Sequence, residues 1–364
     1  MPDVFIGLMS GTSRDGIDAV AVTFSDKSLE ILATHSHPYP DNLADALSRL
    51  VDSPESTNLD QLGELHAWVG DVFGEAAESI QAKITAPGAS VIAIGSHGQT
   101  IRHGPDSDHP FSLQIGCGAR IAATSGVDTV ADFRSADIAA GGQGAPLVPP
   151  FHQWLLAAPD KRTAVANIGG IANVTLLDGT HSVTGFDTGP GNSLMDAWIR
   201  RYQGKPFDDG GRWAGTAAAN AALLQRMLDD PYFARPSPKS TGFEYFNLDW
   251  LDRFEPADPA VTQATLLALT ATTIADAVST FGAERLLVCG GGAHNNALMR
   301  ALADALPGLV VETTETDGVH PDWVEATAFA WLARERIHNR PANSPSVTGA
   351  SRPVCLGAVY PATR

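Results

Sequence analysis

Residues 163–177, TAVANIGGIANVTLL, form two apolar, β-prone runs on either side of a glycine pair. This arrangement predicts two antiparallel strands joined by a tight glycine turn. Residues 4–24, VFIGLMSGTSRDGIDAVAVTF, repeat it, with the loop GTSRDG between the two runs. The sequence therefore predicts one hairpin with a glycine turn in each half of the chain.

The segments that follow the two hairpins also correspond. After the first we predict a third strand, a long amphipathic helix capped by Thr57 or Asn58, and a buried strand ending in glycines, over residues 29–35, 59–84 and 90–94. After the second we predict helices and another buried strand ending in glycines, over residues 264–278, 285–289, 296–306 and 325–337. Residue identity between the halves is negligible, so the correspondence rests on the order of elements.

A duplicated α/β domain with a cleft between its two copies is the simplest explanation of this order. We predict domains at residues 1–132 and 133–364, with the residues after 340 packing on either domain. The length of 364 residues agrees with two domains of ordinary size.

The composition is that of a folded globular protein, with 44% hydrophobic and 18% charged residues. The net charge is 24 − 41 = −17, so the surface repels nucleic-acid phosphates and anionic lipids. We therefore predict neither a nucleic-acid partner nor a membrane partner. An anionic ligand must then be held by backbone N–H groups, by a few placed cations or by a divalent cation.

Cysteine usage and the apolar runs predict a cytoplasmic protein. Cys117, Cys289 and Cys355 lie far apart in no metal-binding spacing, which fits a reducing compartment. The first residues lack the basic segment of a signal peptide. The longest uncharged run, 138–159, contains GGQGAP and VPP, which would break a membrane helix.

The loop GTSRDG at 11–16 has the glycine spacing of a Walker loop, but Ile17 and Asp18 follow where Lys and Ser or Thr are required. The stretch GGGAHN at 290–295 fails as a dinucleotide fingerprint, because Asn295 replaces its last glycine. The first loop does offer backbone N–H groups, hydroxyls and carboxylates, from Ser10, Thr12, Ser13, Asp15 and Asp18. Such groups can hold phosphate oxygens while a carboxylate binds Mg²⁺, directly or through water. An ordinary tight turn with solvated acids is the alternative.

Residues 185–198, GFDTGPGNSLMDAW, carry the sharpest local signal. We predict that Asp187 ends a short strand, that TGPGN turns the chain and that a helix begins near Ser193. A carboxylate held rigidly beside a helix N-terminus suits a general base or a metal ligand. The alternative is that Asp187 caps the turn, a common role for aspartate.

Two further stretches gather polar side chains. Asp132, Arg134 and Asp137 precede the glycine-rich stretch 139–150, and an arginine flanked by acids can grip a substrate oxygen or form a structural ion pair. The stretch GSHGQTIRHGP places polar groups at the end of a predicted strand, namely His97, Gln99, Arg102 and His103. The histidines here share no helical face, which disfavours a transition-metal site, and the chain has no GxSxG elbow of a serine hydrolase.

Taken together, these segments resemble the anhydro-N-acetylmuramic acid kinase family over nearly the whole chain. The matching stretches are GLMSGTSRDGID (7–18), GSHGQTI (95–101), DFRSADIAAGGQGAPLVPPFH (132–152), NIGGIANVT (167–175), GFDTGPGN (185–192), CGGGAHN (289–295) and EATAFAWLA (325–333). The resemblance implies the α/β fold of the actin and hexokinase superfamily. That fold has two ribonuclease H-like domains with mixed central sheets and a nucleotide cleft between the domains.

The resemblance also implies roles for particular residues. Asp187 would be the catalytic base. The residues implied for ATP are Gly11, Thr12, Ser13, Asp15, Gly16 and Asp18 in the first hairpin, Asn167, Gly169 and Gly170 in the second, and Gly290, Gly291 and Gly292 after the later strand. Mg²⁺ would be bound by Asp15 and Asp18, directly or through water. The residues implied for the sugar are Asp132, Arg134, Glu325, His97 and Gln99. Phe243 departs from the family, which is expected to have arginine there.

The implied activity is that of a cytoplasmic, homodimeric kinase of peptidoglycan recycling. It would convert 1,6-anhydro-N-acetylmuramic acid, water and ATP to N-acetylmuramic acid 6-phosphate. Asp187 would deprotonate the water that opens the anhydro bridge, and the freed O6 would attack the γ-phosphate. Two alternatives stay open: another sugar kinase of the superfamily, and an actin-like or chaperone-like ATP switch. A non-enzymatic sugar-binding module would leave the paired hairpins unexplained.

Overall fold

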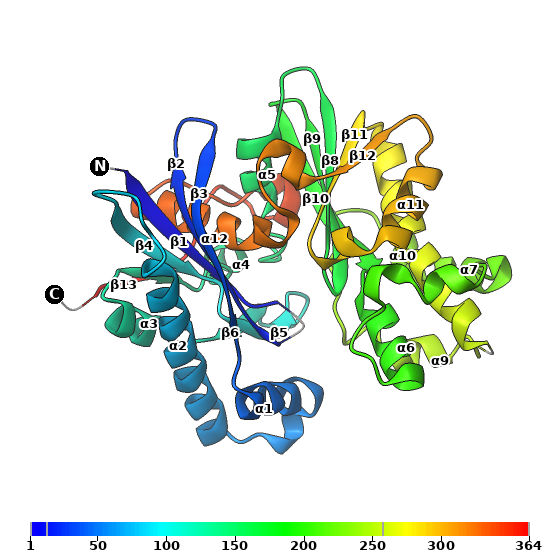
Figure 1. Ribbon diagram of the computed structural model, residues 1–364, viewed down its shortest axis with the longest axis horizontal. Helices are drawn as coiled ribbons and strands as arrows, with labels where there is room; N and C mark the ends of the chain where they lie inside the picture. Colours follow the sequence, from blue (N-terminus) through cyan, green and yellow to red (C-terminus); the bar gives the residue numbers. More distant parts are fainter. Residues whose placement is uncertain (1, 12–13, 257, 363–364) are drawn as a thin grey trace. The chain divides into compact units, whose positions relative to one another are not determined.

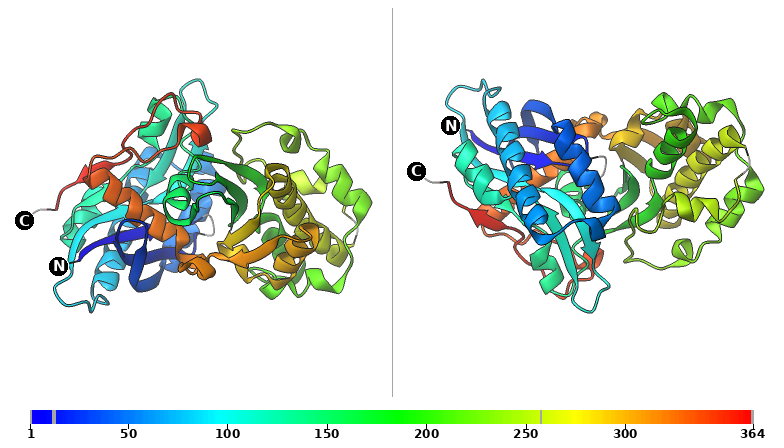
Figure 2. Two further views of the ribbon diagram at one scale, coloured as in Figure 1. Left: turned by 90° about the horizontal axis from the view of Figure 1, so that it is seen from above. Right: turned by 90° about the horizontal axis from the view of Figure 1, so that it is seen from below.

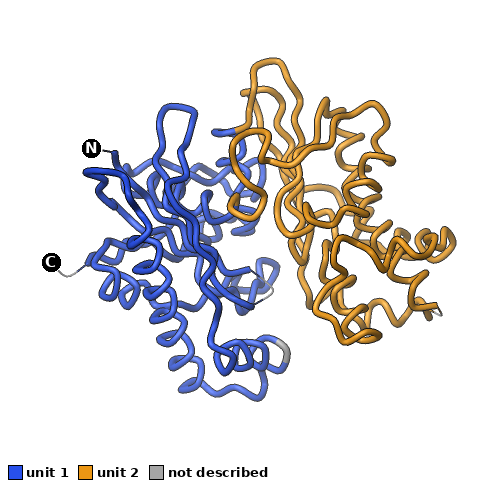
Figure 3. Tube along the Cα trace, in the orientation of Figure 1, with its two compact units in different colours: residues 1–155, 325–364 blue, residues 156–324 orange. Residues whose placement is uncertain are grey.

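The computed structural model describes residues 2–11, 14–256 and 258–362. The chain divides into two compact units, coloured in Figure 3: unit 1 holds Met1–Leu155 and Glu325–Arg364, and unit 2 holds Leu156–Val324. These bounds differ from the predicted division after residue 132, because unit 1 continues to Leu155 and the chain later returns to unit 1 with its last long helix. The residues after 340, which were predicted to pack on either domain, belong to unit 1.

Unit 1 is built on a sheet with the strand order β13-β7-β4-β1-β2-β3 and has a separate hairpin, β5-β6. Its strands are β1 (Asp3–Met9), β2 (Gly16–Phe24), β3 (Leu29–Pro38), β4 (Ser90–Ser96), β5 (Gln99–Gly104), β6 (Phe111–Ile115), β7 (Thr129–Ala131) and β13 (Ala358–Tyr360). Its helices are α1 (Asp41–Asp52), η1 (Pro54–Ser56), α2 (Leu59–Gln81), α3 (Gly118–Ser125), α4 (Ser135–Ala139), α5 (Pro149–Leu156), α12 (Val324–Ile337) and α13 (Pro345–Thr348).

Unit 2 is built on a sheet with the strand order β10-β9-β8-β11-β12. Its strands are β8 (Arg162–Ile168), β9 (Ile171–Asp178), β10 (Ser182–Pro190), β11 (Arg285–Cys289) and β12 (Val310–Thr313). Its longer helices are α6 (Ser193–Gln203), α7 (Ala221–Leu228), α8 (Pro231–Ala234), α9 (Leu248–Asp252), α10 (Pro259–Phe281) and α11 (Asn296–Ala305). Short 3-10 turns complete it: η2 (Asp209–Gly211), η3 (Ala214–Thr216), η4 (Gly291–His294), η5 (Thr314–Asp317) and η6 (Pro321–Trp323).

The two sheets repeat one topology. The strands β3-β2-β1-β4-β7 and β10-β9-β8-β11-β12 both follow the order third, second, first, fourth, fifth. In each unit the first three strands form an antiparallel meander, and the fourth and fifth run parallel to the first. This is the order of the ribonuclease H-like fold, so the predicted duplicated actin/hexokinase-like architecture is confirmed.

Local sequence accounts for most of these elements. Helix α2 begins at a capping box, in which Asn58 Oδ1 accepts from the Gln61 amide at 2.9 Å and Gln61 Oε1 accepts from the Asn58 amide at 3.0 Å. Asn58, one of the two predicted caps, is therefore confirmed. Helix α1 and the hairpin β5-β6 were not predicted, although α1 has an amphipathic pattern that buries Leu43, Leu47 and Leu50.

Helix α12 lies directly on the central strands of the unit 1 sheet (Figures 1 and 2). A Cβ atom on Gly7 of β1 would lie 1.7 Å from the carbonyl oxygen of Ala326, and one on Gly95 of β4 would lie 2.0 Å from that of Phe329. Because only glycine leaves room for so close an approach, the helix backbone rests on the strand backbones. This contact fixes the first turn of α12, which carries Glu325, against β1.

Helix α10 crosses the centre of unit 2 and packs against β9, β10, α6, α7 and α11. By length and composition alone it could span a membrane, yet 61% of its most apolar window is buried inside the structure. Its first residue also joins the core, because the indole N–H of the buried Trp198 donates to the Pro259 carbonyl at 2.9 Å. The helix is accounted for as the core helix of its unit.

Candidate active site

Backbone hydrogen bonds from the N-terminus of α6 hold the glycine turn of the β8-β9 hairpin. The carbonyl oxygen of Gly169 accepts from the Asn192 amide at 2.8 Å, and that of Gly170 accepts from the amides of Gly191 and Ser193 at 2.9 and 3.1 Å. Among the residues that the structure describes, no hydrogen bond has the amide of Gly169 or Gly170 as its donor. The turn therefore offers two backbone donors of the kind that bind phosphate oxygens.

The end of β8 meets the glycine loop that follows β11. These strands are parallel neighbours, with Asn167 opposite Cys289. A Cβ atom on Gly290 would lie 2.5 Å from Asn167 Oδ1, and Gly290 has a φ of +76°, so this position requires glycine. Asn167 is 6% exposed, and within the described ranges its Oδ1 has no hydrogen-bond partner.

Three predicted nucleotide-binding groups of unit 2 therefore lie together: Asn167, the Gly169–Gly170 turn and the loop 290–292. They lie at the end of the sheet where the neighbouring strands β8 and β11 finish side by side (Figure 1). Backbone amides, a buried amide oxygen and glycines without side chains form an arrangement that fits a nucleotide's phosphates and sugar.

Asp187 lies within β10, opposite Asn173 of β9, and not at the end of the strand as predicted. The strand continues to Pro190 because a register shift between Asp187 and Gly189 lets the pairing resume. The N-cap residue of α6 is Asn192, so Asp187 does not cap that helix. The prediction of a helix beginning near Ser193 is confirmed.

Hydrogen bonds fix both the backbone and the side chain of Asp187. Its amide donates to the Lys239 carbonyl at 3.1 Å, and its own carbonyl accepts from the Tyr232 hydroxyl at 2.7 Å. Its Oδ2 accepts from the Thr241 amide at 2.9 Å. A carboxylate held in this way has a defined direction, which a general base requires.

The sequence reasoning missed Lys239, which anchors the segment that holds Asp187. Lys239 is 6% exposed, and its Nζ donates to the carbonyls of Tyr232 and Phe233, each at 3.3 Å. Burial lowers the pKa of Lys239, Arg235 lowers it further, and the negative charge of Asp187 opposes both effects. The stretch PKSTG around this lysine was the available signal. Phe243, the departure from the family, follows directly on this stretch.

The first hairpin of unit 1 is supported by Gln99. The Ser10 hydroxyl lies 2.8 Å from Gln99 Oε1, and Gln99 Nε2 donates to the Gly11 carbonyl at 3.1 Å. Gln99 is 2% exposed, so its amide serves the hairpin from inside the unit. The Ser10 hydroxyl also reaches the carbonyl of Gly16 at 2.8 Å, across the base of the loop.

The predicted magnesium ligands lie on this hairpin and its second strand. Asp15 is exposed, and its carbonyl accepts from the Tyr39 amide at 3.0 Å. Asp18 Oδ1 accepts from the Ser36 hydroxyl at 2.9 Å. Thr12 and Ser13, also predicted to bind the nucleotide, lie outside the described residues. Among those described, no group of three His, Cys, Asp or Glu could hold a metal ion. Mg²⁺ would therefore need oxygens from the nucleotide's phosphates as well.

Arg134 and His97 lie against each other in unit 1. Arg134 Nη2 donates to His97 Nε2 at 2.8 Å, and Arg134 Nη1 donates to the Gly144 carbonyl at 2.8 Å. Asp132 is exposed, has a left-handed φ of +56°, and accepts from the Ser135 hydroxyl at 2.6 Å. Its carboxylate is thus placed at the surface of the unit, two residues from Arg134.

Asp137 is fully buried and joins the glycine-rich loop to the C-terminal segment. Its Oδ2 accepts from the Gly144 amide at 2.8 Å. Its Oδ1 accepts from Asn343 Nδ2 and from the Thr348 hydroxyl, both at 2.8 Å. Asp137 therefore has a structural role, because it fixes the residue whose carbonyl receives the Arg134 guanidinium.

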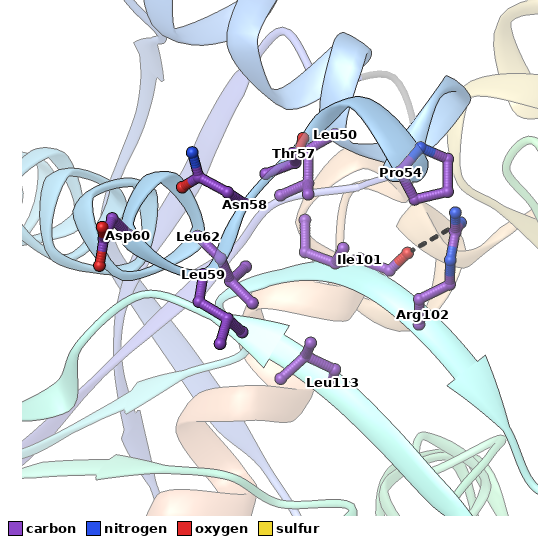
Figure 4. Close-up of a pocket in the computed structure, with 10 residues that line it drawn as sticks. All are labelled: Leu50, Pro54, Thr57, Asn58, Leu59, Asp60, Leu62, Ile101, Arg102 and Leu113. Atoms are coloured by element: carbon purple, nitrogen blue, oxygen red, sulfur yellow. Dashed lines mark hydrogen bonds between the residues drawn. The ribbon is translucent and has the colours of Figure 1, made fainter.

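Arg102 and His103 face other partners. Arg102 Nη1 donates to the Val51 carbonyl at 3.2 Å, and His103 Nδ1 lies 3.0 Å from the Ser112 hydroxyl. Arg102 also lines a largely apolar surface pocket between α1, α2 and the β5-β6 hairpin, shown with its ten lining residues in Figure 4. None of the residues implied for catalysis, ATP, Mg²⁺ or the sugar lines this pocket.

The buried histidines of unit 1 predict acid sensitivity. Burial lowers the pKa of His97 to about 3, with a further contribution from Arg134, and burial alone lowers that of His152 to about 3. Both imidazoles are neutral when folded but titrate near 6.5 when unfolded, so their stabilising effect is complete above pH 6.5 and is lost as the pH falls toward 3. We expect the free energy of unfolding to drop by about 1.4 kcal/mol per pH unit for each group below pH 6.5.

Urea unfolding at pH 7.5, 6.0 and 5.0 measures this drop in the free energy of unfolding. Equal values at all three would contradict the prediction, and His152→Phe should reduce the slope.

Comparison with known proteins gives one consistent result. A family model described as anhydro-N-acetylmuramic acid kinase matches residues 3–362. The protein of that name from Xanthomonas campestris pv. campestris (strain 8004) is 50% identical over 367 residues, which cover 99% of this chain and 97% of that protein. Those from Xylella fastidiosa (strain Temecula1) and Shewanella denitrificans (strain OS217) are each 48% identical, with 99% of this chain and 96% and 99% of those proteins covered.

Proposed function

Because the chain belongs to the anhydro-N-acetylmuramic acid kinase family and is a kinase of that sugar, we propose a mechanism and a site for its reaction. The enzyme converts 1,6-anhydro-N-acetylmuramic acid, water and ATP to N-acetylmuramic acid 6-phosphate and ADP. The observation that carries the proposed site is the placement of Asp187 beside the glycine turn of the same sheet. Asp187 pairs with Asn173, three residues beyond Gly170, which corresponds to roughly 10 Å along the strand.

Asp187 acts as the general base. It takes a proton from a water molecule as that water attacks the anomeric carbon, and the bond from this carbon to the bridging oxygen breaks. The Thr241 amide holds one carboxylate oxygen, and the Tyr232 hydroxyl holds the backbone behind it. This fixed geometry spares the enzyme the cost of orienting the base during the reaction. The bridging oxygen becomes the O6 nucleophile that receives the phosphoryl group.

Backbone groups of both hairpins bind the nucleotide in this proposal. In unit 2 these are the amides of Gly169 and Gly170, with Asn167 and the loop 290–292 toward the nucleoside. In unit 1 the loop Gly11–Gly16 contacts the phosphates, including Thr12 and Ser13. ATP supplies the γ-phosphoryl group, and Asp15 and Asp18 would hold Mg²⁺, directly or through water, where it would neutralise phosphate charge. A surface of net charge −17 makes the cation useful here, because it lowers the repulsion of ATP.

Sugar contacts come from unit 1 in this proposal. Asp132, Arg134 and Glu325 contact the substrate, as the family motifs imply. Gln99 and His97 support their neighbours, since Gln99 is bonded to the first hairpin and His97 to Arg134. The exposure of Asp132 and the position of Glu325 in the first turn of α12 are compatible with contact to a ligand.

The test is to identify the product formed in isotopically labelled water. Purified protein is incubated with MgATP and the anhydro sugar in H₂¹⁸O, and the product is analysed by mass spectrometry. We expect a product that has gained one phosphate and one water, with ¹⁸O on the anomeric carbon. N-acetylmuramic acid and N-acetylglucosamine serve as control acceptors. A phosphorylated product that keeps the anhydro ring, or ATP turnover independent of any sugar, would overturn the proposal.

The proposal extends to a cytoplasmic homodimer of peptidoglycan recycling. All three cysteines are free thiols in the structure, which agrees with a reducing compartment. Light scattering coupled to size-exclusion chromatography tests the dimer directly, because a 38.2 kDa chain gives clearly different monomer and dimer masses.

A further inference from the structure

We propose that His97 is a positioning residue that acts through Arg134, as a neutral hydrogen-bond acceptor, and that it does not contact the sugar itself. The inference rests on the proposed role of Arg134 in sugar binding. It assigns His97 a different role from the direct contact that the sequence motifs imply.

The two ring nitrogens of His97 have opposite roles. Nδ1 lies 2.9 Å from the Gly98 carbonyl, which can only accept a hydrogen bond, so Nδ1 carries the proton. Nε2 is then an acceptor, and it faces Arg134 Nη2 at 2.8 Å. A guanidinium is always protonated and only donates, so this pair has one consistent arrangement. The lowered pKa of His97 agrees with a neutral ring at physiological pH.

The His97 ring is buried and packed within unit 1. It is 6% exposed, and its ring centre lies 4.8 Å from that of Phe329 on α12. Its backbone amide donates to the Leu8 carbonyl at 2.9 Å, which ties the residue to the end of β1. A ring fixed between a strand and a helix can impose its own orientation on the arginine that bonds to it.

A second acceptor holds the other side of the Arg134 guanidinium. Nη1 donates to the Gly144 carbonyl, and the Gly144 amide is bonded to the buried carboxylate of Asp137. Two fixed acceptors, one on each terminal nitrogen, preset the plane of the guanidinium before any ligand arrives. Preorganisation of this kind lowers the conformational entropy that binding must otherwise overcome. Because the histidine is neutral, its contact orients the guanidinium without cancelling the positive charge.

Steady-state kinetics with His97→Leu and His97→Gln test this inference. Loss of a hydrogen bond to a charged group should raise the KM for the anhydro sugar by about 10-fold to 100-fold in His97→Leu. The KM for ATP should change much less than the KM for the sugar, because Arg134 is not among the groups proposed for the nucleotide. His97→Gln should restore most of the sugar affinity, since Oε1 can accept from Arg134. His152→Leu is the matched control, because it removes another buried histidine and should leave the sugar KM unchanged.

A double-mutant cycle separates positioning from direct contact. If His97 acts through Arg134, then His97→Leu should add little to the loss already caused by Arg134→Ala. An undiminished effect of His97→Leu in the Arg134→Ala background would overturn the inference, as would equal losses in His97→Leu and His97→Gln at unchanged thermal stability. Failure of the underlying function is distinct from this, because wild-type protein would then fail to phosphorylate the anhydro sugar. If wild type is active and Arg134→Ala keeps its sugar KM, the inference is wrong.

Discussion

Replacement of Asp187 by asparagine is expected to lower kcat for the anhydro sugar by about three orders of magnitude. The asparagine Oδ1 can still accept from the Thr241 amide, so the backbone and the side-chain direction should persist. What is lost is the ability to take a proton from water, which affects the transition state more than substrate binding. The KM for both substrates should therefore change little. Initial rates and circular dichroism spectra of the purified variant measure activity and fold together.

Asp178→Asn on the neighbouring strand is the control for this prediction. Its carboxylate pairs with Arg162 at 3.1 Å and is half exposed, so the change removes a charge from the same sheet outside the proposed site. We expect wild-type kcat in this variant. Near-wild-type turnover by Asp187→Asn would show that another group, or none, activates the water.

Replacement of Gly7 by alanine is expected to lower the free energy of unfolding by about 3 kcal/mol. The new methyl group would lie 1.7 Å from the Ala326 carbonyl oxygen, so α12 must move away from β1. Urea unfolding followed by tryptophan fluorescence measures the loss. Because Glu325 lies in the turn that moves, the sugar KM should also rise.

Gly63→Ala is the matched control, since both variants add one methyl group to a glycine of unit 1. Gly63 lies in α2, and nothing is within 4 Å of the position that its Cβ would take. Alanine is the better helix former, so this variant should gain up to about 1 kcal/mol. If Gly7→Ala proved as stable as Gly63→Ala, the close packing of α12 on β1 would be wrong.

The elements predicted correctly from sequence are those whose signal is local. The turn at Gly169–Gly170, the Asn58 cap of α2 and the strand running into Gly290 each follow from neighbouring residues. The division of the chain into units could not be predicted from neighbouring residues, because α12 is distant in sequence from the strands that it covers. In the sequence, the only sign of the contact at Gly7 is a glycine within a strand. Topology of this kind becomes visible only when the strand order is known.

The proposed site shows the same limit. Asp187 stands out because turn residues follow it, but the residue that holds its carboxylate, Thr241, is 54 positions further along the chain. Lys239 is only seven and six residues from Tyr232 and Phe233, yet the sequence does not show that its ammonium group bonds their carbonyls. His97 and Gln99 were recognised as polar groups at a strand end, yet what each one bonds could not be read from spacing. Sequence patterns located the candidate groups, and only coordinates assigned their partners.

Unit 2 is one uninterrupted stretch, whereas unit 1 needs residues from both ends of the polypeptide. On the ribosome, the whole of unit 2 is therefore synthesised while unit 1 still lacks α12, the helix that covers β1 and β4. Domains generally fold as they emerge, so unit 2 can complete its core first. Until α12 is synthesised, one apolar face of the unit 1 sheet stays uncovered. Chaperone contact during translation is thus expected to centre on the amino-terminal sheet.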